Sequence, residues 1–111
     1  ISHMLGAKAF EVHLCNHWPE WGVKLLATLE KGDYKQVELD MIKEALPYYR
    51  LWKKIEQTYT VGDGFVDKLC MELIGLPSSR CRPPTRDIRE QYREEARQML
   101  IQCGTPRVIA A

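Results

Sequence analysis

Three residues that can bind a metal alternate near the start of the chain: His13, Cys15 and His17. Alternate side chains of a β-strand point to one face, so this H-x-C-x-H segment could place three zinc ligands together. A structural zinc site usually takes four ligands from two separated pairs, and no second pair stands at a recognisable spacing. We therefore expect ordinary side chains at a strand-to-helix junction and no metal site.

Arginines gather around Cys81 in the segment 80–89. Guanidinium groups bind oxyanions through paired hydrogen bonds, so Arg80, Arg82 and Arg86 form a candidate site for a phosphate or a carboxylate. The same charges, together with Arg89, could make the Cys81 thiol reactive. The alternative that we favour is structural, with the arginines holding this connector against acidic helix residues, namely Glu90, Glu94 and Glu95.

Four aromatic residues, Tyr48, Tyr49, Trp52 and Tyr59, could form a platform for a ligand. Aromatic residues at helical spacing more often anchor a core or an interface, and we expect that role here. No serine–histidine–acid triad, glycine-rich phosphate loop or pair of catalytic carboxylates stands out. The sequence therefore predicts no catalytic residue and no cofactor within this chain.

Length and charge exclude several classes of protein. A chain of 111 residues fits one domain but is too short for a closed (β/α)8 barrel of roughly 250 residues. The 16 basic and 15 acidic residues are well mixed, which argues against a nucleic acid or a membrane as partner. The four cysteines show no C-x-x-C spacing, and no apolar run reaches about 18 residues. We expect reduced thiols and a cytoplasmic protein.

The first part of the chain predicts one strand and one helix. Residues 1–4 resemble the remainder of a cleaved expression tag. Residues 7–14 alternate apolar and polar side chains, which predicts a short strand with no second strand to pair with. A helix then follows to Lys31, capped near Asn16 or His17, with Pro19 in its first turn and Gly32 at its end.

Three further helices complete a mainly α fold. Asp33 caps a long helix over 34–59, in which Pro47 predicts a kink because it removes one hydrogen bond. A short helix over 65–74 is apolar nearly all round and ends at Gly75. An amphipathic helix over 88–102 follows the proline- and arginine-rich connector, and its charges predict i,i+4 ion pairs on a solvated face. Residues 105–111 are expected to fray.

Four segments, in this order and spacing, carry a family resemblance: GAKAFEVHLCNHWPEW, EKGDY, EALPYYRLW and DKLCMELIGLPSSRCRPP. Together they resemble the C-terminal part of the dihydrodipicolinate synthase and N-acetylneuraminate lyase family. The last segment is the most specific of the four. The chain has TVGDGF where the family often has an asparagine–proline pair, so the resemblance leaves the subfamily and its substrate open.

The resemblance implies an aldolase-type (β/α)8 barrel in which a lysine forms a Schiff base with pyruvate or a related keto acid, assisted by a tyrosine. Those residues would lie upstream of this chain, and Lys68 matches a structural lysine of the family. Residues 5–31 would then be the remnant of the last barrel strand and helix, and residues 32–104 the C-terminal helical domain. This fragment would be catalytically silent.

The partner implied by the resemblance is the missing barrel portion or a second copy of the chain. The apolar face on Trp18, Trp21 and Leu25 would pack on the barrel, so in its absence we expect this face to be exposed and to drive homo-oligomer formation or helix rearrangement. Two alternatives remain open. One is a self-sufficient helical interaction module that docks through the arginine connector, and the other is a regulatory piece with an arginine-based carboxylate site.

Overall fold

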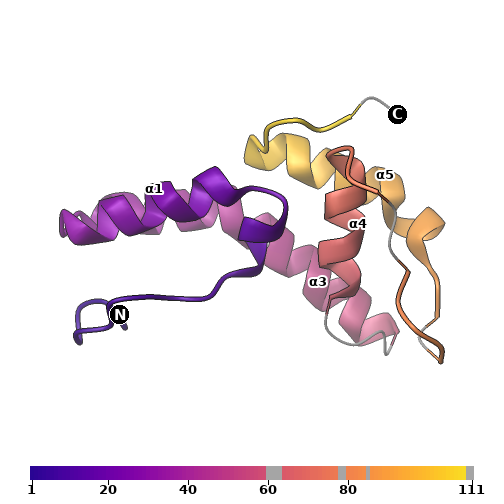
Figure 1. Cartoon of the computed structure of the whole chain (residues 1–111), viewed down its shortest axis with the longest axis horizontal. Coiled ribbons are helices and arrows are strands. Elements are labelled where there is room, and N and C mark those ends of the chain that lie inside the picture. The colour runs from indigo at the N-terminus through magenta and orange to yellow at the C-terminus, as the bar shows by residue number, and fades with distance from the viewer. Residues whose placement is uncertain (60–63, 78–79, 85, 110–111) are drawn as a thin grey trace.

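The computed structural model describes residues 1–59, 64–77, 80–84 and 86–109. The described chain is mainly helical and has no residue in a β-strand, which confirms the predicted fold class in its coarse form (Figure 1). No described helix is both long and apolar enough to cross a membrane. In chain order the elements are a 3-10 turn η1 (His13–Asn16), α1 (Pro19–Glu30), α2 (Tyr34–Asp40), a π-helical turn η2 (Met41–Ala45), α3 (Leu46–Thr58), α4 (Phe65–Leu73) and α5 (Arg89–Cys103).

The strand predicted over residues 7–14 is wrong. Residues 7–12 run without secondary structure along the side of the molecule, and the chain then tightens into η1 (Figure 1). A single strand cannot pair its own backbone groups, so the alternation of side chains alone does not make a strand. The turn also carries Leu14 into the core, where its side chain is buried.

The first helix was predicted close to its observed place. Helix α1 starts at Pro19 with Trp18 as its N-cap, one or two residues after the predicted cap at Asn16 or His17. Gly32 follows the helix with a φ of +73°, the left-handed conformation expected of a glycine at a helix end. Asp33 caps α2 as predicted, because its carboxylate accepts a hydrogen bond from the backbone N–H of Gln36 at 3.2 Å.

The long second helix continues through Pro47 by widening one turn. The backbone N–H of Leu46 bonds to the carbonyl of Met41, an i,i+5 bond that belongs to the π-helical turn η2. Pro47 then lies in the first turn of α3, where its missing N–H removes no helical hydrogen bond. The helix is therefore uninterrupted from α2 to α3, as the periodicity predicted.

Helices α4 and α5 confirm the predictions for the second half of the chain. Gly75 ends α4 with a φ of +95°, and the N–H of Leu76 bonds back to the carbonyl of Met71 at 3.1 Å. This pairing is a Schellman motif, which satisfies carbonyls that the helix end leaves open. Asp87 accepts a hydrogen bond from the N–H of Arg89 at 3.3 Å and precedes the N-cap Ile88, which agrees with the helix predicted from residue 88.

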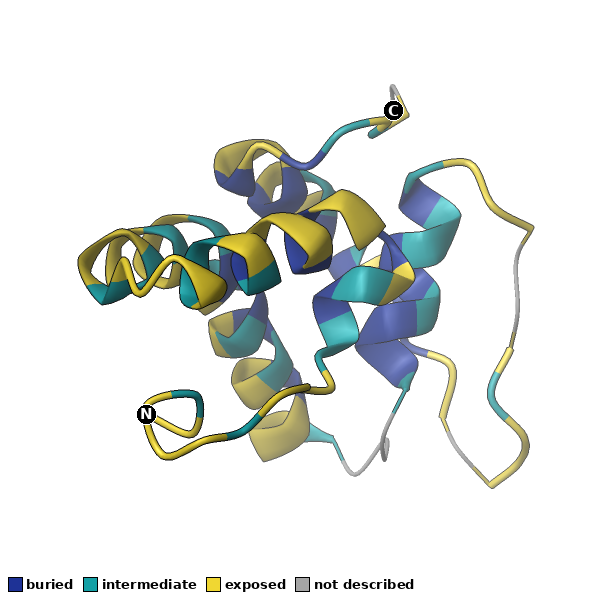
Figure 2. Cartoon of the chain, turned by 60° about the vertical axis from the view of Figure 1, so that its left-hand side comes forward, coloured by how far each residue is buried: buried dark blue, intermediate teal, exposed yellow. Residues whose placement is uncertain are grey.

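The core gathers around α4, where buried residues line most of the helix, and extends to the inner faces of the surrounding helices (Figure 2). The expectation of an exposed apolar face on Trp18, Trp21 and Leu25 is wrong, since these side chains are only 9%, 1% and 7% exposed. They join the same hydrophobic cluster as Leu14 and Tyr48. The chain covers this face itself because η1 folds back against α1 and α4.

Candidate functional site

A buried carboxylate links three elements that are distant in the sequence. Asp67 of α4 lies in the core, and its Oδ2 is 2.6 Å from Nδ1 of His13 in η1. Its other oxygen accepts a hydrogen bond from the hydroxyl of Tyr48 in α3. A buried carboxylate needs such partners because desolvation otherwise disfavours its charge. We call Asp67, His13 and Tyr48 the Asp67 cluster.

Tyr48 is the hydrogen-bond donor that holds the buried side of the cluster. Burial raises the pKa of its phenol far above the usual value, and the hydrogen bond and negative charge of Asp67 raise it further. The hydroxyl therefore stays protonated and donates to the carboxylate. Burial also raises the pKa of the neighbouring Tyr49, with a smaller contribution from the charge of Asp67.

A second histidine lies deeper than the first. His17 is only 1% exposed, its ring centroid is 5.6 Å from that of Tyr48, and its Nδ1 has no hydrogen-bond partner among the described residues. Burial lowers the pKa of this imidazole to about 4, although the negative charge of Asp67 acts in the opposite direction. His17 is therefore neutral at neutral pH, while His13 is the histidine that contacts the carboxylate.

His13 also borders solvent. Its ring meets Trp52 edge-on at 4.6 Å between centroids, and its side chain is about one third exposed. It lines an open cavity of about 380 Å³ whose other walls are Tyr49, Trp52, Lys53 and Glu56. A carboxylate at Nδ1 orients an imidazole and selects its tautomer, which is the arrangement that acid–base sites use. The same contact also fastens η1 to α4, so it has a structural function whether or not a ligand binds.

The candidate metal ligands His13, Cys15 and His17 do not converge on one point. His13 contacts Asp67, His17 faces Tyr48, and the Sγ of Cys15 lies against Gly22 of α1. The alternation that would have aligned the three side chains requires a strand, whereas His13–Asn16 is a 3-10 turn. Within the described ranges, no three histidine, cysteine or acidic residues are grouped so as to hold a metal ion. All four cysteines are free thiols.

The three arginines of the predicted anion site have different contacts. Arg80 forms an ion pair with Asp87 at 2.5 Å, and the guanidinium of Arg86 lies 5.8 Å from the ring centroid of Tyr59. Arg80, Cys81 and Arg86 share a cavity of only about 20 Å³, which has room for about one water molecule. Arg82 is exposed on the connector. An anion site on Arg80, Arg82 and Arg86 therefore stays a prediction, and Asp87 already compensates the charge of Arg80.

Arginines of α5 pair with Glu72 of α4, which was not among the predicted acids, and with Glu90, which was. The buried Arg89 pairs with Glu72 of α4 at 2.6 Å, and Arg93 bridges Glu72 and Glu90 at 2.8 Å each. Desolvation raises the pKa of Glu72, yet the hydrogen bonds and charges of Arg93 and Arg89 outweigh it and leave the pKa below its usual value. This network joins α4 to α5, which makes it part of the core packing.

The i,i+4 pairs predicted on the last helix are wrong in their spacing. Arg93 pairs with Glu90, and Arg97 with Glu94 at 2.8 Å, both at i,i+3. Residues four apart on this stretch carry like charges, so opposite charges meet only at a spacing of three. Glu95 instead pairs with Lys54 of α3 at 2.7 Å.

The aromatic residues divide between two places. Tyr48, Tyr49 and Trp52 form one cluster, in which Tyr49 and Trp52 stack at 6.4 Å with an interplanar angle of 23°. Tyr59 lies apart from them, with its hydroxyl 2.8 Å from Gln91 and its ring edge-on to Tyr92. The buried Tyr48 is a core residue, so only the half-buried Tyr49 and Trp52 are placed to meet a ligand.

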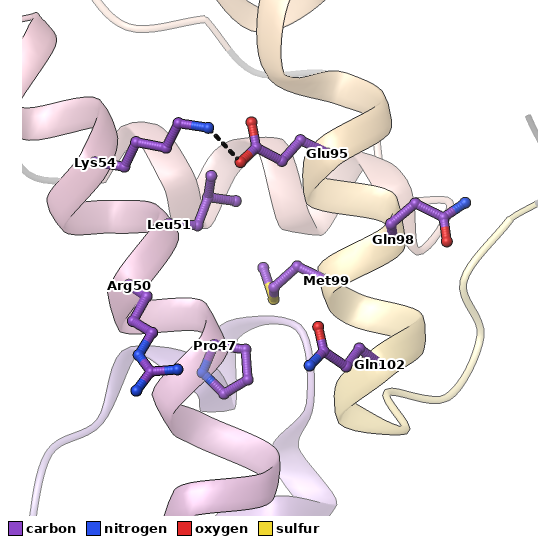
Figure 3. A pocket seen from close by; sticks show the side chains of 8 residues that line it. All are labelled: Pro47, Arg50, Leu51, Lys54, Glu95, Gln98, Met99 and Gln102. Atoms are coloured by element: carbon purple, nitrogen blue, oxygen red, sulfur yellow. Dashed lines mark hydrogen bonds and ion pairs between the residues drawn. The ribbon is translucent and has the colours of Figure 1, made fainter.

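A second open cavity, of about 370 Å³, lies between α3 and α5 (Figure 3). The ion pair of Lys54 with Glu95 spans the two helices at one end of this cavity, and Leu51 and Met99 lie beside it between the helices (Figure 3). The two charges compensate each other, and the lining holds no cysteine or histidine.

Comparison of the chain with family models, with curated proteins and with solved structures finds no match. Sequence reasoning missed the Asp67 cluster, whose members lie up to 54 residues apart. One feature of the sequence could have indicated it. Asp67 is a single acid in the first turn of a helix that is otherwise apolar nearly all round, and such a residue needs a partner inside the fold.

Proposed function

We propose that this chain is the C-terminal part of an enzyme of the dihydrodipicolinate synthase and N-acetylneuraminate lyase family. In this proposal the whole enzyme cleaves or condenses pyruvate-like keto acids in the cytoplasm through a lysine Schiff base. The part seen here does no Schiff-base chemistry. It supports the barrel by packing against it and helps subunits to associate, and its long helix is bent at Pro47.

The observation that carries the proposal is the segment over residues 7–12. It has alternating apolar side chains and no strand partner among the described residues, and it leads through η1 into α1. A last barrel strand cut off from its neighbours would have these properties, because its partners would lie in the missing part. The helical unit that follows is the second feature that the family resemblance implies.

Lys68, which does not match the Schiff-base lysine of the family, has a structural contact. Lys68 of α4 is half-buried, and its Nζ donates a hydrogen bond to the carbonyl of Arg80 at 3.3 Å. This contact holds the connector against α4. We therefore expect the Schiff-base lysine outside residues 1–111.

Reductive trapping tests the proposal. The genomic reading frame that contains this chain would be expressed at full length, incubated with pyruvate and reduced with borohydride. We expect a pyruvyl adduct on one lysine upstream of the present residue 1, and none on the isolated chain under the same conditions. Absence of an adduct on the longer protein, or a reading frame without alternating strands and helices upstream, contradicts the proposal.

A helical interaction module is the second candidate, and the exposure of the connector favours it. Arg82, Pro83, Pro84 and Arg86 are all exposed. The module would dock a protein partner through these residues, and a reading frame without strands and helices upstream favours it. A regulatory piece with an arginine-based carboxylate site is a separate candidate, which calorimetric titration with pyruvate and with glutamate tests. Heat that disappears in the Arg82→Ala, Arg86→Ala double variant supports the carboxylate site, whereas no heat with either ligand removes it.

A further inference from the structure

We propose that the cavity between α3 and α5 is a binding site for a small carboxylate that carries an apolar chain (Figure 3). In this site Arg50 and Gln102 bind the carboxylate, and Leu51 and Met99 contact the chain. The site goes beyond the function proposed above, because residues 5–31, which that proposal assigns to the barrel, contribute nothing to its lining. It can therefore fail while the lyase assignment stands, and the reverse.

The cavity lies between one face of α3 and one face of α5. Each helix contributes lining residues at the spacing i, i+3, i+4 and i+7, which places them on a single face. This spacing covers about 10 Å along a helix, and the volume of about 370 Å³ falls within the range of sites for small molecules. The lining residues are Pro47, Arg50, Leu51 and Lys54 of α3 and Glu95, Gln98, Met99 and Gln102 of α5. A ligand that lies along these faces can therefore contact both helices.

The two ends of the cavity differ in charge. At one end the Nζ of Lys54 lies 2.7 Å from the carboxylate of Glu95, so these two charges compensate each other. At the other end Arg50 lines the α3 side and Gln102 the α5 side, and the amide of Gln102 is directed toward Pro47 (Figure 3). Neither Arg50 nor Gln102 has a side-chain hydrogen bond or ion pair with any residue that the structure describes. This end therefore has an uncompensated positive charge and an open amide.

The helix that carries Arg50 supplies no acid to compensate it. The residues three and four positions away are Leu46, Pro47, Lys53 and Lys54. By contrast, Arg93 and Arg97 of α5 each pair with a glutamate three positions earlier. An ion pair one helical turn away would satisfy a guanidinium, and its absence at Arg50 leaves a local positive potential. This potential favours an anionic ligand over a cationic one.

A carboxylate suits the Arg50 end, and an apolar chain suits the middle of the cavity. A guanidinium donates two parallel hydrogen bonds to a carboxylate, and the amide of Gln102 can donate a third. Between the two ends lie the buried side chains of Leu51 and Met99, whose only polar atom is a weakly accepting thioether. A methylene chain can pack on these two side chains, whereas a second charged group there would lose water without gaining a partner. The ligand that fits is therefore a monocarboxylate with an apolar chain.

Titration of the isotope-labelled 111-residue chain with hexanoate, followed by heteronuclear NMR, tests the site. We expect saturable shifts of the side-chain amide of Gln102 and of backbone amides in α3 and α5. Hexylamine has the same chain and the opposite charge, so it should cause no saturable shift. Arg50→Gln should weaken hexanoate binding about tenfold or more, because it removes the charge and the paired hydrogen bonds. The proposal is overturned if no shift occurs, or if the saturable shifts are confined to the arginine connector over residues 80–89.

Lys53→Gln is the matched control for the charge. Lys53 is an exposed cation three residues from Arg50 on α3, but it lines the cavity beside His13 and not this one. We expect the affinity for hexanoate to stay within about twofold, because an exposed charge outside the site is screened by solvent. Equal losses in the two variants would show that hexanoate responds only to the net charge of α3, which overturns the site. Far-UV circular dichroism checks that both variants are folded.

Acetate tests the contact with the chain. It keeps the carboxylate of hexanoate and lacks most of the methylene groups, so it should bind about tenfold or more weakly. Equal affinities of acetate and hexanoate would mean that Leu51 and Met99 contact no part of the ligand, and this would overturn the proposed class of ligand.

Discussion

Paired ionisable residues lie in two regions that differ in burial. One region is the junction of η1 with α3 and α4, and the other is the outer face of α5. At the junction, Asp67 is buried and each of its oxygens has one partner. On α5, Glu94 and Arg97 pair at 2.8 Å, but Glu94 stays largely exposed. Water already solvates Glu94, whereas the buried Asp67 depends on protein groups to replace water. Equal contact distances therefore do not imply equal contributions to stability.

The two pairs also differ in the sequence separation of the residues that they join. The pair on α5 joins two residues one helical turn apart, so it constrains little that the helix does not already constrain. The contact of His13 with Asp67 joins residues 54 positions apart and fastens the N-terminal turn to the core. Loss of the contact between His13 and Asp67 should therefore release the N-terminal turn from the core, whereas loss of the Glu94–Arg97 pair should release no structure.

The largest expected effect is that of Asp67→Ala. The change leaves the buried hydroxyl of Tyr48 without its acceptor and removes the contact to His13, so the free energy of unfolding should fall by about 3 kcal/mol or more in urea denaturation. Adding Tyr48→Phe should cost much less in the Asp67→Ala background than in the wild-type chain, because the hydroxyl has then already lost its partner. Equal cost in both backgrounds would show that the two groups are not coupled.

The next effect is a dependence of stability on pH that comes from His17. Its pKa is about 4 in the folded chain, against 6.5 for an unperturbed imidazole, because burial disfavours the charged ring. The unfolded chain therefore takes up the proton first as pH falls, so the stability contributed by the neutral ring is present above pH 6.5 and is lost progressively toward pH 4, about 3 kcal/mol in total.

Urea denaturation between pH 7 and pH 4 measures this loss, and His17→Gln serves as the reference. The difference in unfolding free energy between the two chains should change with pH over this interval, since carboxylates such as Glu72, whose pKa is lowered, titrate alike in both. Parallel curves for the two chains would mean that His17 takes up its proton equally in the folded and unfolded states.

A smaller effect is expected from Gly22→Ala at the same junction. A Cβ at this position would lie 2.4 Å from the Sγ of Cys15, so the Cys15 side chain or η1 has to move away from α1. We expect a loss of about 1–3 kcal/mol in thermal or urea unfolding. Adding Cys15→Ala should remove the clash and restore the stability. The stability can even exceed that of the wild-type chain, because alanine at residue 22 favours helix α1 more than glycine does. Failure of the second change to rescue the first would contradict the contact.

The smallest effect is expected from Glu94→Ala on α5. The pair with Arg97 is exposed and lies within one helix, so the urea midpoint should not change measurably. Raising the salt concentration should leave wild type and variant equally stable. A loss as large as that of Asp67→Ala would remove the distinction between the two regions.

Local features of the sequence determined the helices. Asp33, Gly32, Gly75 and Gly104 stand where helices start or end, and each takes the conformation or contact that these residue types favour. These features predict correctly because a helix is built from contacts between residues three and four apart, all of which the local sequence contains. The continuity of the helix through Pro47 followed from the same periodicity.

Tertiary structure decided the rest. Alternation over residues 7–14 could not become a strand without a neighbour, and the apolar face of Trp18 and Trp21 was covered by the chain's own N-terminal turn. The partner of Asp67 was equally undetermined, because His13 reaches it only after η1 docks on α4. Contacts between distant segments depend on how helices pack, and no spacing along the chain specifies that packing. The sequence by itself therefore determined where the helices lie, and the tertiary structure determined which side chains they bring together.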